Sequence, residues 1–186
     1  IRDRSIGDGS IIGGVHKGCR ELYNAGWVDK IPRLIGVQST GSNAIAHAWE
    51  NDLSPVEMTS RPANTIADSI SSRLPRDRAK ALRAVRETHG AVVQVDDTDI
   101  LAAIPRLALQ TGIFAEPAAA ATFAGLNHAL SAGYIHPADH VLLLITGNGL
   151  KDVQGAMQAV HDQQVPATSP TLEAVRRQVE QWDRNA

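Results

Sequence analysis

A glycine-rich turn near the start of the chain has the residue types of a phosphate site. Residues 6–18 read IGDGSIIGGVHKG, so Gly7 and Gly9 precede a helix that we expect to begin near Ser10. Glycine lacks a Cβ atom, and its backbone can therefore turn N–H groups toward one point. The first N–H groups of a helix have no intrahelical acceptor, and the helix dipole places partial positive charge there. The pattern predicts a phosphate site, although a tight turn and helix cap without a ligand would have the same sequence.

Three further motifs follow the turn. They read TIADSI at residues 65–70, GIFAEPAAAA at residues 112–121 and LITGNGLKD at residues 144–152. Together with the turn they resemble, in the same order, the motifs of the fold-type II pyridoxal-phosphate (PLP) enzymes. The ending T-G-N-G-L-K-D is most similar to that of threonine synthases. The resemblance runs from about residue 6 to residue 160, and four motifs in register are far more specific than any one of them.

The resemblance implies which residues would hold PLP. Gly7 to Ile11 would surround the phosphate, Thr146 would face the pyridine nitrogen, and Glu116 would lie near the ring. The implied cofactor-binding set is therefore Gly7, Asp8, Gly9, Ser10, Ile11, Glu116 and Thr146. Without the family, Thr146 would be a turn hydroxyl and Glu116 a helix cap.

This sequence departs from the family pattern at several of these motifs. Asp8 stands where asparagine is common, and we expect its carboxylate to point away from a phosphate because like charges repel. Ser10 replaces a frequent glycine and adds a hydroxyl donor, whereas Ala119 replaces the usual serine and removes one. Asp68 and Ser69 correspond to the mouth of the family's active site, although an ordinary helix start would look the same.

The lysine that forms a Schiff base with PLP has no match in this sequence. Its lysines are Lys17, Lys30, Lys80 and Lys151. Lys17 lies two turns into the first helix, and Lys151 belongs to the G-L-K-D ending, where the family uses a lysine structurally. We therefore expect no catalytic residue in this chain, with the lysine in a segment upstream of an incomplete sequence. The chain alone should neither bond PLP covalently nor make threonine.

Several functions remain open at this stage. The resemblance implies a PLP-dependent lyase of the threonine synthase type, which converts O-phosphohomoserine and water to threonine and phosphate. Threonine dehydratase or another PLP amino-acid lyase is the nearest alternative. A non-catalytic binding module with this fold would explain the missing lysine but not the intact turn and Thr146. A Rossmann nucleotide site is disfavoured because Ile12 stands where that motif requires glycine.

Composition narrows the classes of partner. The chain has 186 residues, 43% of them apolar, which is typical of a globular domain. Its net charge of −2 and lack of a basic block argue against nucleic acid. No apolar run approaches the ~20 residues of a membrane span, and no signal peptide is visible. We expect a cytoplasmic homodimer that acts on a small-molecule amino-acid phosphate, and no metal, because Pro137 disfavours a helix that would pair His136 with His140.

Strand and helix patterns alternate along the chain. Sequence patterns typical of strands occur at residues 1–6, 33–38, 91–95 and 140–145. The continuous apolar run at residues 140–145 is suited to a strand covered on both faces. The alternation predicts an α/β fold, a parallel sheet with helices on both faces. Such sheets bind ligands at the carboxyl ends of their strands, so the glycine turn and Thr146 should share one site.

Helix signals set the remaining boundaries. The first helix should bury Ile11, Val15, Cys19, Leu22 and Tyr23, which lie at helical spacing. Other helices should start near Thr65, after Asp96 as an N-cap, and at Pro117.

Two parts of unequal size are expected from these patterns. Residues 1–162 should form the C-terminal half of the PLP-binding large domain. Residues 163–186 should form a polar linker and a last amphipathic helix, which we expect over residues 171–182.

Overall fold

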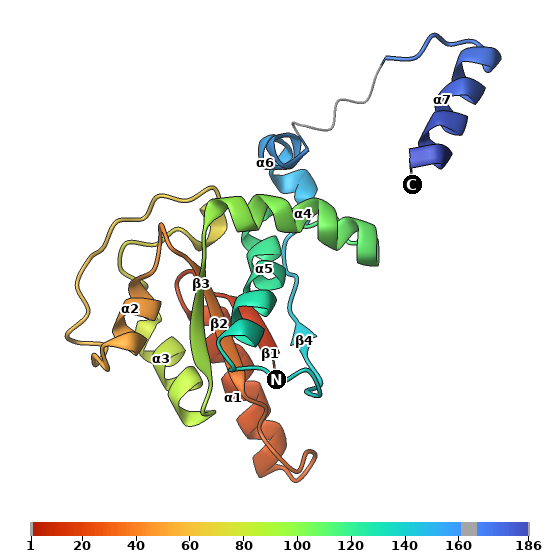
Figure 1. Cartoon of the computed structure of the whole chain (residues 1–186). Helices are drawn as coiled ribbons and strands as arrows, with labels where there is room; N and C mark the ends of the chain where they lie inside the picture. The colour runs from red at the N-terminus through yellow and green to blue at the C-terminus, as the bar shows by residue number, and fades with distance from the viewer. Residues whose placement is uncertain (1, 161–166, 186) are drawn as a thin grey trace.

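A parallel sheet lies at the centre of the structure (Figure 1). The computed structural model describes residues 2–160 and 167–185. Within these residues the strand order is β3–β2–β1–β4, and every neighbouring pair is parallel. The elements are β1 (Arg2–Ser5), α1 (Ser10–Asn24), β2 (Leu34–Ser39), α2 (Ala44–Glu50), η1 (Asp68–Ile70), α3 (Arg78–Glu87), β3 (Ala91–Val95), α4 (Asp97–Thr111), α5 (Pro117–Ser131), β4 (Leu142–Leu143), η2 (Gly149–Lys151), α6 (Val153–Ala159) and α7 (Leu172–Asn185). The predicted α/β class with a parallel sheet is confirmed.

Helices cover both faces of the sheet (Figure 1). One core cluster joins α1, α2 and α3 to Leu34 and Val92, and the other joins α4 and α5 to Val37 and Val93. Side chains alternate between the two faces of a strand, so neighbouring residues of β2 serve opposite layers. All six residues of β2 are buried, which fits a central strand of a covered parallel sheet.

The helix α5 lies unusually close to the sheet. It begins with a buried run of alanines at residues 118–121, and a Cβ atom at Gly125 would lie only 2.4 Å from Cγ2 of Val37. Small side chains therefore let the α5 backbone approach β2, and this fixes the position of the residues at its N-terminus.

Several predicted boundaries are confirmed. The strand predicted at residues 91–95 is β3. Asp96 caps α4 by accepting a 3.0 Å hydrogen bond from the N–H of Asp99, and Gly112 ends that helix with φ +73°. Pro117 opens α5, as expected from its fixed φ and missing donor.

The helix predicted from Thr65 is wrong. Only the short 3₁₀ helix η1 (Asp68–Ile70) forms there. The Asp97 carboxylate accepts hydrogen bonds from the Thr65 hydroxyl at 2.5 Å and from the Ile66 N–H at 3.0 Å. These contacts hold the segment against the start of α4.

The strand predicted at residues 140–145 is largely wrong in length and in its surroundings. Only Leu142–Leu143 forms β4, and it pairs with β1 at the edge of the sheet. Leu142 is 48% exposed. With the Leu142 side chain exposed and Leu143 only half-buried, the expectation that this run is covered on both faces does not hold.

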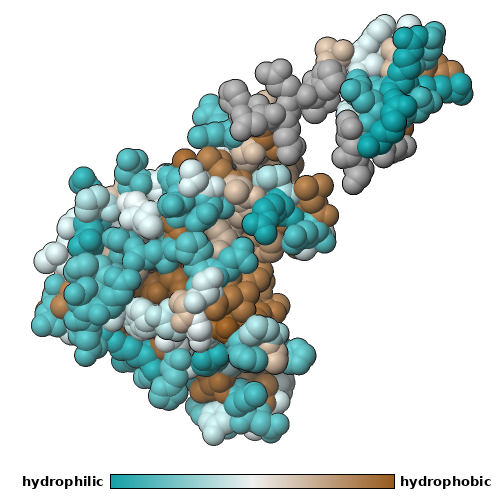
Figure 2. Space-filling view, in the orientation of Figure 1, coloured by the Kyte–Doolittle hydropathy of each residue, from teal (hydrophilic) through white to brown (hydrophobic). Residues whose placement is uncertain are grey.

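Apolar side chains remain on the surface near this edge. Figure 2 shows apolar residues gathered over α5 and β4 and further ones over α6. Leu142 of β4 and Val153 and Met157 of α6 are among the exposed large hydrophobic residues. Exposed apolar patches of this kind mark surfaces at which a soluble protein binds further protein.

The buried face of α1 differs in part from the prediction. Cys19 is buried and Val15 packs half-buried against the core, as predicted. Ile11, Leu22 and Tyr23 are exposed, whereas Ile12, Gly13 and His16 are buried. A Cβ atom at Gly13 would lie 2.7 Å from Cβ of Lys80 on α3. The missing side chain at Gly13 lets α3 pack closely against this stripe, which turns α1 away from the face that apolar spacing predicted.

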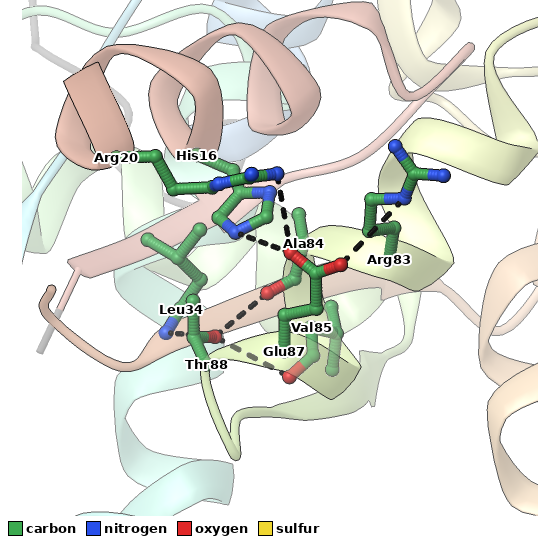
Figure 3. Close-up of polar contacts among 8 residues, drawn as sticks. All are labelled: His16, Arg20, Leu34, Arg83, Ala84, Val85, Glu87 and Thr88. Carbon is green, nitrogen blue, oxygen red and sulfur yellow. Dashed lines mark hydrogen bonds and ion pairs between the residues drawn. The ribbon is translucent and has the colours of Figure 1, made fainter. Parts of the chain in front are cut away.

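His16 lies at this contact between α1 and α3 (Figure 3). Its side chain is buried, and its Nε2 atom is 3.3 Å from Oε2 of Glu87. Arg20 and Arg83 also approach the Glu87 carboxylate, at 3.5 and 3.7 Å. Burial lowers the pKa of His16, Glu87 opposes that shift, and the two arginines add to it. The cluster joins α3 to α1, the helix that follows the glycine turn, on one face of the sheet.

The C-terminal helix is confirmed as α7 (Leu172–Asn185), three residues longer than predicted at its end. The predicted division between residues 162 and 163 lies outside the described residues, as do Ile1 and the linker up to residue 166, so these stay predictions. In the part of the chain that the structure describes, no helix is both long and apolar enough to cross a membrane.

Candidate active site

The glycine turn connects β1 to α1 in a backbone shape that requires its glycines. Gly9 has φ +89°, and a Cβ atom there would lie 2.8 Å from Cβ of Ala81 and 2.9 Å from the carbonyl oxygen of Asp77. At Gly7 a Cβ atom would lie 2.9 Å from Cα of Ile70. Both positions therefore combine a close approach to neighbouring backbone with a tight turn.

The turn presents unpaired donors at the start of α1. The Gly13 N–H donates to the Gly9 carbonyl at 3.1 Å, which is the first hydrogen bond of the helix. The N–H groups from Gly9 to Ile12 precede that bond and have no intrahelical acceptor. Together with the positive end of the helix dipole they can bind an anion.

Gln38 supports the turn from the centre of the sheet. It is fully buried in β2 and donates through Nε2 to the carbonyl of Ile6 at 3.1 Å. Its Oε1 atom accepts from the Ala46 N–H at 2.8 Å. Sequence reasoning missed this residue, although a polar side chain inside a continuous apolar strand was the available signal. Gln38 thus fixes the residue that leads into the turn.

Asp8 is held by the segment that follows η1. Its Oδ1 atom accepts hydrogen bonds from the Ser72 hydroxyl at 3.2 Å and from the Arg76 N–H at 3.4 Å. Its carbonyl accepts from the Asp77 N–H at 2.9 Å. These bonds direct the carboxylate to residues 72–76; because Ser72 lines the same cavity as the glycine turn, the expectation that the carboxylate points away from a phosphate stays a prediction.

One cavity brings the predicted residues together. It has a volume of about 360 Å³, within the ~300–1,000 Å³ of ligand pockets. Its wall includes all members of the implied set: Gly7, Asp8, Gly9, Ser10, Ile11, Glu116 and Thr146. Ser69 of the predicted mouth also lines it, and Asp68 lines an adjoining cavity of about 350 Å³ that shares Ser69 and Glu116. The glycine turn and Thr146 therefore line one volume, as predicted from their places at the carboxyl ends of parallel strands.

Glu116 and Thr146 contribute a second wall of the cavity, from segments far from the turn in the chain. Glu116 is 7% exposed and directly precedes α5, but its side chain does not cap that helix. Its carboxylate instead lies 3.1 Å from Nζ of Lys151, and its N–H donates to the carbonyl of Gly147 at 3.1 Å. Glu116 thus occupies the N-cap position of α5 as expected, but its carboxylate forms an ion pair with Lys151 instead of a capping hydrogen bond.

Lys151 is a wall residue that sequence reasoning did not place in the site. Among the lysines in the described residues, it is the one that lines this cavity. Lys17 and Lys80 lie in a groove between α1 and α3 and pair with Glu21 and Asp77. The G-L-K-D motif was the signal for Lys151, but its partner lies 35 residues earlier in the chain.

A match to the model of a protein family shows to which family the chain belongs. The model described as pyridoxal-phosphate dependent enzyme matches residues 5–147. The chain belongs to the pyridoxal-phosphate dependent enzyme family. The matched range begins just before the glycine turn and ends just after Thr146, so it spans both walls of the cavity.

Relatives within this family are named as threonine synthases. Those of Methanocaldococcus jannaschii and Mycobacterium tuberculosis (strain H37Rv) are each 33% identical to the chain, over 154 and 165 residues. These alignments cover 83% and 89% of the chain but 38% and 42% of the relatives. The chain thus spans about two-fifths of the length of the curated relatives that it matches.

Solved structures of the pyridoxal-phosphate family have the same fold. Threonine deaminase isoform 2 from Solanum lycopersicum, in its processed form, has a TM-score of 0.66 at 16% identity, covering 88% of this chain and 44% of its own. A fungal L-serine ammonia-lyase from Rhizomucor miehei has a TM-score of 0.66 at 22% identity, covering 88% and 50%. At these identities the likeness supports the fold and not the substrate.

The residues present fit the family's cofactor. PLP carries a phosphate group and a pyridine ring, and needs a protein to hold both. The turn offers unpaired N–H groups where side chains at Gly7 or Gly9 would clash with neighbouring backbone. Thr146 adds a hydroxyl to the other wall of the same cavity. One volume thus offers anion donors and a polar side chain suited to a ring nitrogen.

Proposed function

We propose that this chain forms part of a PLP-dependent threonine synthase, which makes threonine and phosphate from O-phosphohomoserine and water. The observation that carries the proposal is the single cavity between the glycine turn and Thr146, in a chain 33% identical to threonine synthases along most of its length. Bound PLP supplies an electron sink for chemistry at the substrate's α-carbon.

The chain's own residues would divide the binding of PLP between two walls. The N–H groups of the turn from Gly7 to Ile11 would hold the phosphate, those of Gly9 to Ile11 because the start of α1 leaves them without an intrahelical acceptor. Thr146 would offer a neutral hydroxyl to the pyridine nitrogen, so the nitrogen would stay largely unprotonated. Glu116 would lie near the ring.

We propose that the lysine that bonds PLP covalently lies in another part of the enzyme. Lys17 and Lys80 lie in the groove between α1 and α3 rather than at the cavity. Lys151 does line the cavity, but its amine is paired with Glu116. We further propose a cytoplasmic homodimer, which the exposed apolar side chains of β4 and α6 support.

Binding of PLP to the chain tests the site. PLP should quench tryptophan fluorescence, inorganic phosphate should compete with it, and Thr146→Val should weaken PLP binding without changing phosphate binding. Borohydride should trap no adduct on the chain. An adduct that peptide mass spectrometry locates on any of its lysines would contradict the proposed division.

Activity tests the reaction. The chain joined to the remainder of the enzyme, or mixed with it as a second chain, should release phosphate and threonine from O-phosphohomoserine. The chain alone should release neither. Formation of 2-oxobutanoate from threonine without any threonine synthesis would favour a threonine dehydratase. Binding of PLP without turnover by the completed enzyme would favour a non-catalytic module.

A further inference from the structure

The buried carboxylate of Glu116 forms an ion pair with Lys151, which follows the Thr146 turn in the chain. Glu116 is 7% exposed, and its oxygens lie 3.1 and 3.3 Å from Nζ of Lys151. Among the described residues, Lys151 is the one whose side chain forms an ion pair with this carboxylate. A charge removed from water in this way depends strongly on its counter-charge.

The Thr146 turn packs directly on Glu116. The segments that carry them meet in an antiparallel bridge between Ala115 and Asn148. The Glu116 N–H donates to the Gly147 carbonyl, and a Cβ atom at Gly147 would lie 1.8 Å from Oε1 of Glu116. A shift of the carboxylate would therefore be transmitted to the residue that follows Thr146.

Lys151 is anchored independently of Glu116. It ends η2, which follows Asn148, and the side chain of Asn148 accepts a 2.9 Å hydrogen bond from the Leu150 N–H. The Asp152 side chain then caps α6 through the Gly155 N–H at 2.9 Å. The two caps fix the backbone on either side of Lys151, so its amine reaches Glu116 from a defined position.

We propose that Lys151 is a positioning residue that, through Glu116, holds the Thr146–Gly147 turn in place as one wall of the cavity. Its bearing on PLP rests on the proposed function, whereas its effect on the turn does not. Without Lys151, the carboxylate must turn toward water or take up a proton, and either change disturbs its contact with Gly147. The glycine turn should be unaffected, because Gln38 supports it from the sheet.

Lys151→Met removes the charge and keeps most of the apolar stem. Lys151→Arg restores a cation, and Lys17→Met is a matched control, since Lys17 forms an exposed ion pair with Glu21 on α1. Far-UV circular dichroism establishes that each variant is folded.

Hydrogen exchange measures the turn without any ligand. The Gly149 N–H donates to the Phe114 carbonyl at 2.9 Å across the same two segments. Its exchange should become about tenfold faster in Lys151→Met, because the local opening that exposes this N–H to water should cost less free energy in that variant. The rate should return toward that of the original protein in Lys151→Arg and stay unchanged in Lys17→Met.

Ligand binding measures the consequence for the cavity. The dissociation constant for PLP should rise about five- to tenfold in Lys151→Met, a size suited to a pair with one exposed partner. The dissociation constant for inorganic phosphate should change less than about twofold, because the glycine turn is supported by Gln38 and not by the pair of Lys151 with Glu116. In a Glu116→Gln background, Lys151→Met should have no further effect on PLP, because both changes interrupt the same contact.

Two results would overturn the proposal. One is exchange at Gly149 that is the same in Lys151→Met and Lys17→Met. The other is an undiminished effect of Lys151→Met on PLP in the Glu116→Gln background, which would mean that Lys151 touches the ligand itself. If the original protein binds no PLP, the proposed function fails, while hydrogen exchange still decides whether Lys151 positions the turn.

Discussion

Substitution of Gly9 should separate the backbone requirement of the turn from ordinary helix effects. Gly9→Ala places a Cβ atom at φ +89°, where it would lie 2.8 Å from Cβ of Ala81 and 2.9 Å from the Asp77 carbonyl. The left-handed backbone costs an L-residue ~1–2 kcal/mol. Both neighbouring atoms belong to or lead into α3 and cannot swing aside, so overpacking adds ~1–3 kcal/mol. Gly9→Ala should thus lower the free energy of unfolding by about 2–5 kcal/mol.

Gly14→Ala is the matched control for this change. Gly14 lies in the same helix, and a Cβ atom there would have no neighbour within 4 Å. Alanine is the better helix former by ~0.5–1 kcal/mol, so this variant should be slightly more stable. Urea unfolding of both variants gives the two free energies, and titration with inorganic phosphate should show weaker binding only for Gly9→Ala. Equal stability of the two variants would refute the argument that the turn requires glycine.

Other changes test the supports of the site and the α1–α3 contact. Gln38→Leu leaves two buried backbone groups without partners and should cost about 2–6 kcal/mol in urea unfolding, at ~1–3 kcal/mol per group. A loss in the free energy of unfolding no larger than that of an ordinary substitution between apolar core residues would contradict the supporting role of Gln38. Burial holds the pKa of His16 below its ordinary value of 6.5, so protonation favours the unfolded chain. Stability should be complete above that ordinary pKa and should fall as the pH drops through it toward the lower pKa of the folded protein. The variant His16→Gln should lack this fall; an identical pH profile would show that Glu87 or another group causes it. Gly147→Ala would place a Cβ atom 1.8 Å from Oε1 of Glu116, so PLP binding should weaken while phosphate binding persists; equal loss of both would show that the two walls are not independent.

Local sequence signals predicted the elements whose causes are local. Asp96 and Gly112 mark the ends of α4 because a cap and a left-handed residue act within one turn of the helix. The apolar run at residues 91–95 became β3, a largely buried strand that pairs with β2. The glycines of the turn likewise predicted its tight backbone. The places of the turn and of Thr146 at the carboxyl ends of parallel strands were enough to predict that both line one cavity.

The errors come from partners distant in the chain. The segment at Thr65, where a helix was predicted, is instead held by Asp97, which lies 32 residues later in the chain. The face of α1 rotates because Gly13 admits α3, which apolar spacing within one helix cannot reveal. Lys151 and Glu116 are 35 residues apart, and neither motif by itself says that it pairs with the other. Such contacts are set by tertiary packing and not by the pattern of a single segment.

The two walls of the cavity differ in how firmly the fold supports them. The glycine turn follows β1, which lies between two other strands, and it is fastened by Gln38. Thr146 follows β4, a two-residue strand at the edge of the sheet, and depends on the contacts of Glu116. An edge strand with few buried contacts opens locally at lower cost than a central one. The phosphate end should therefore be preformed, whereas the ring end should become ordered as the cofactor binds. Hydrogen exchange at Gly149 should slow on addition of PLP but not of inorganic phosphate; equal slowing by both ligands would mean that the two walls form one rigid unit.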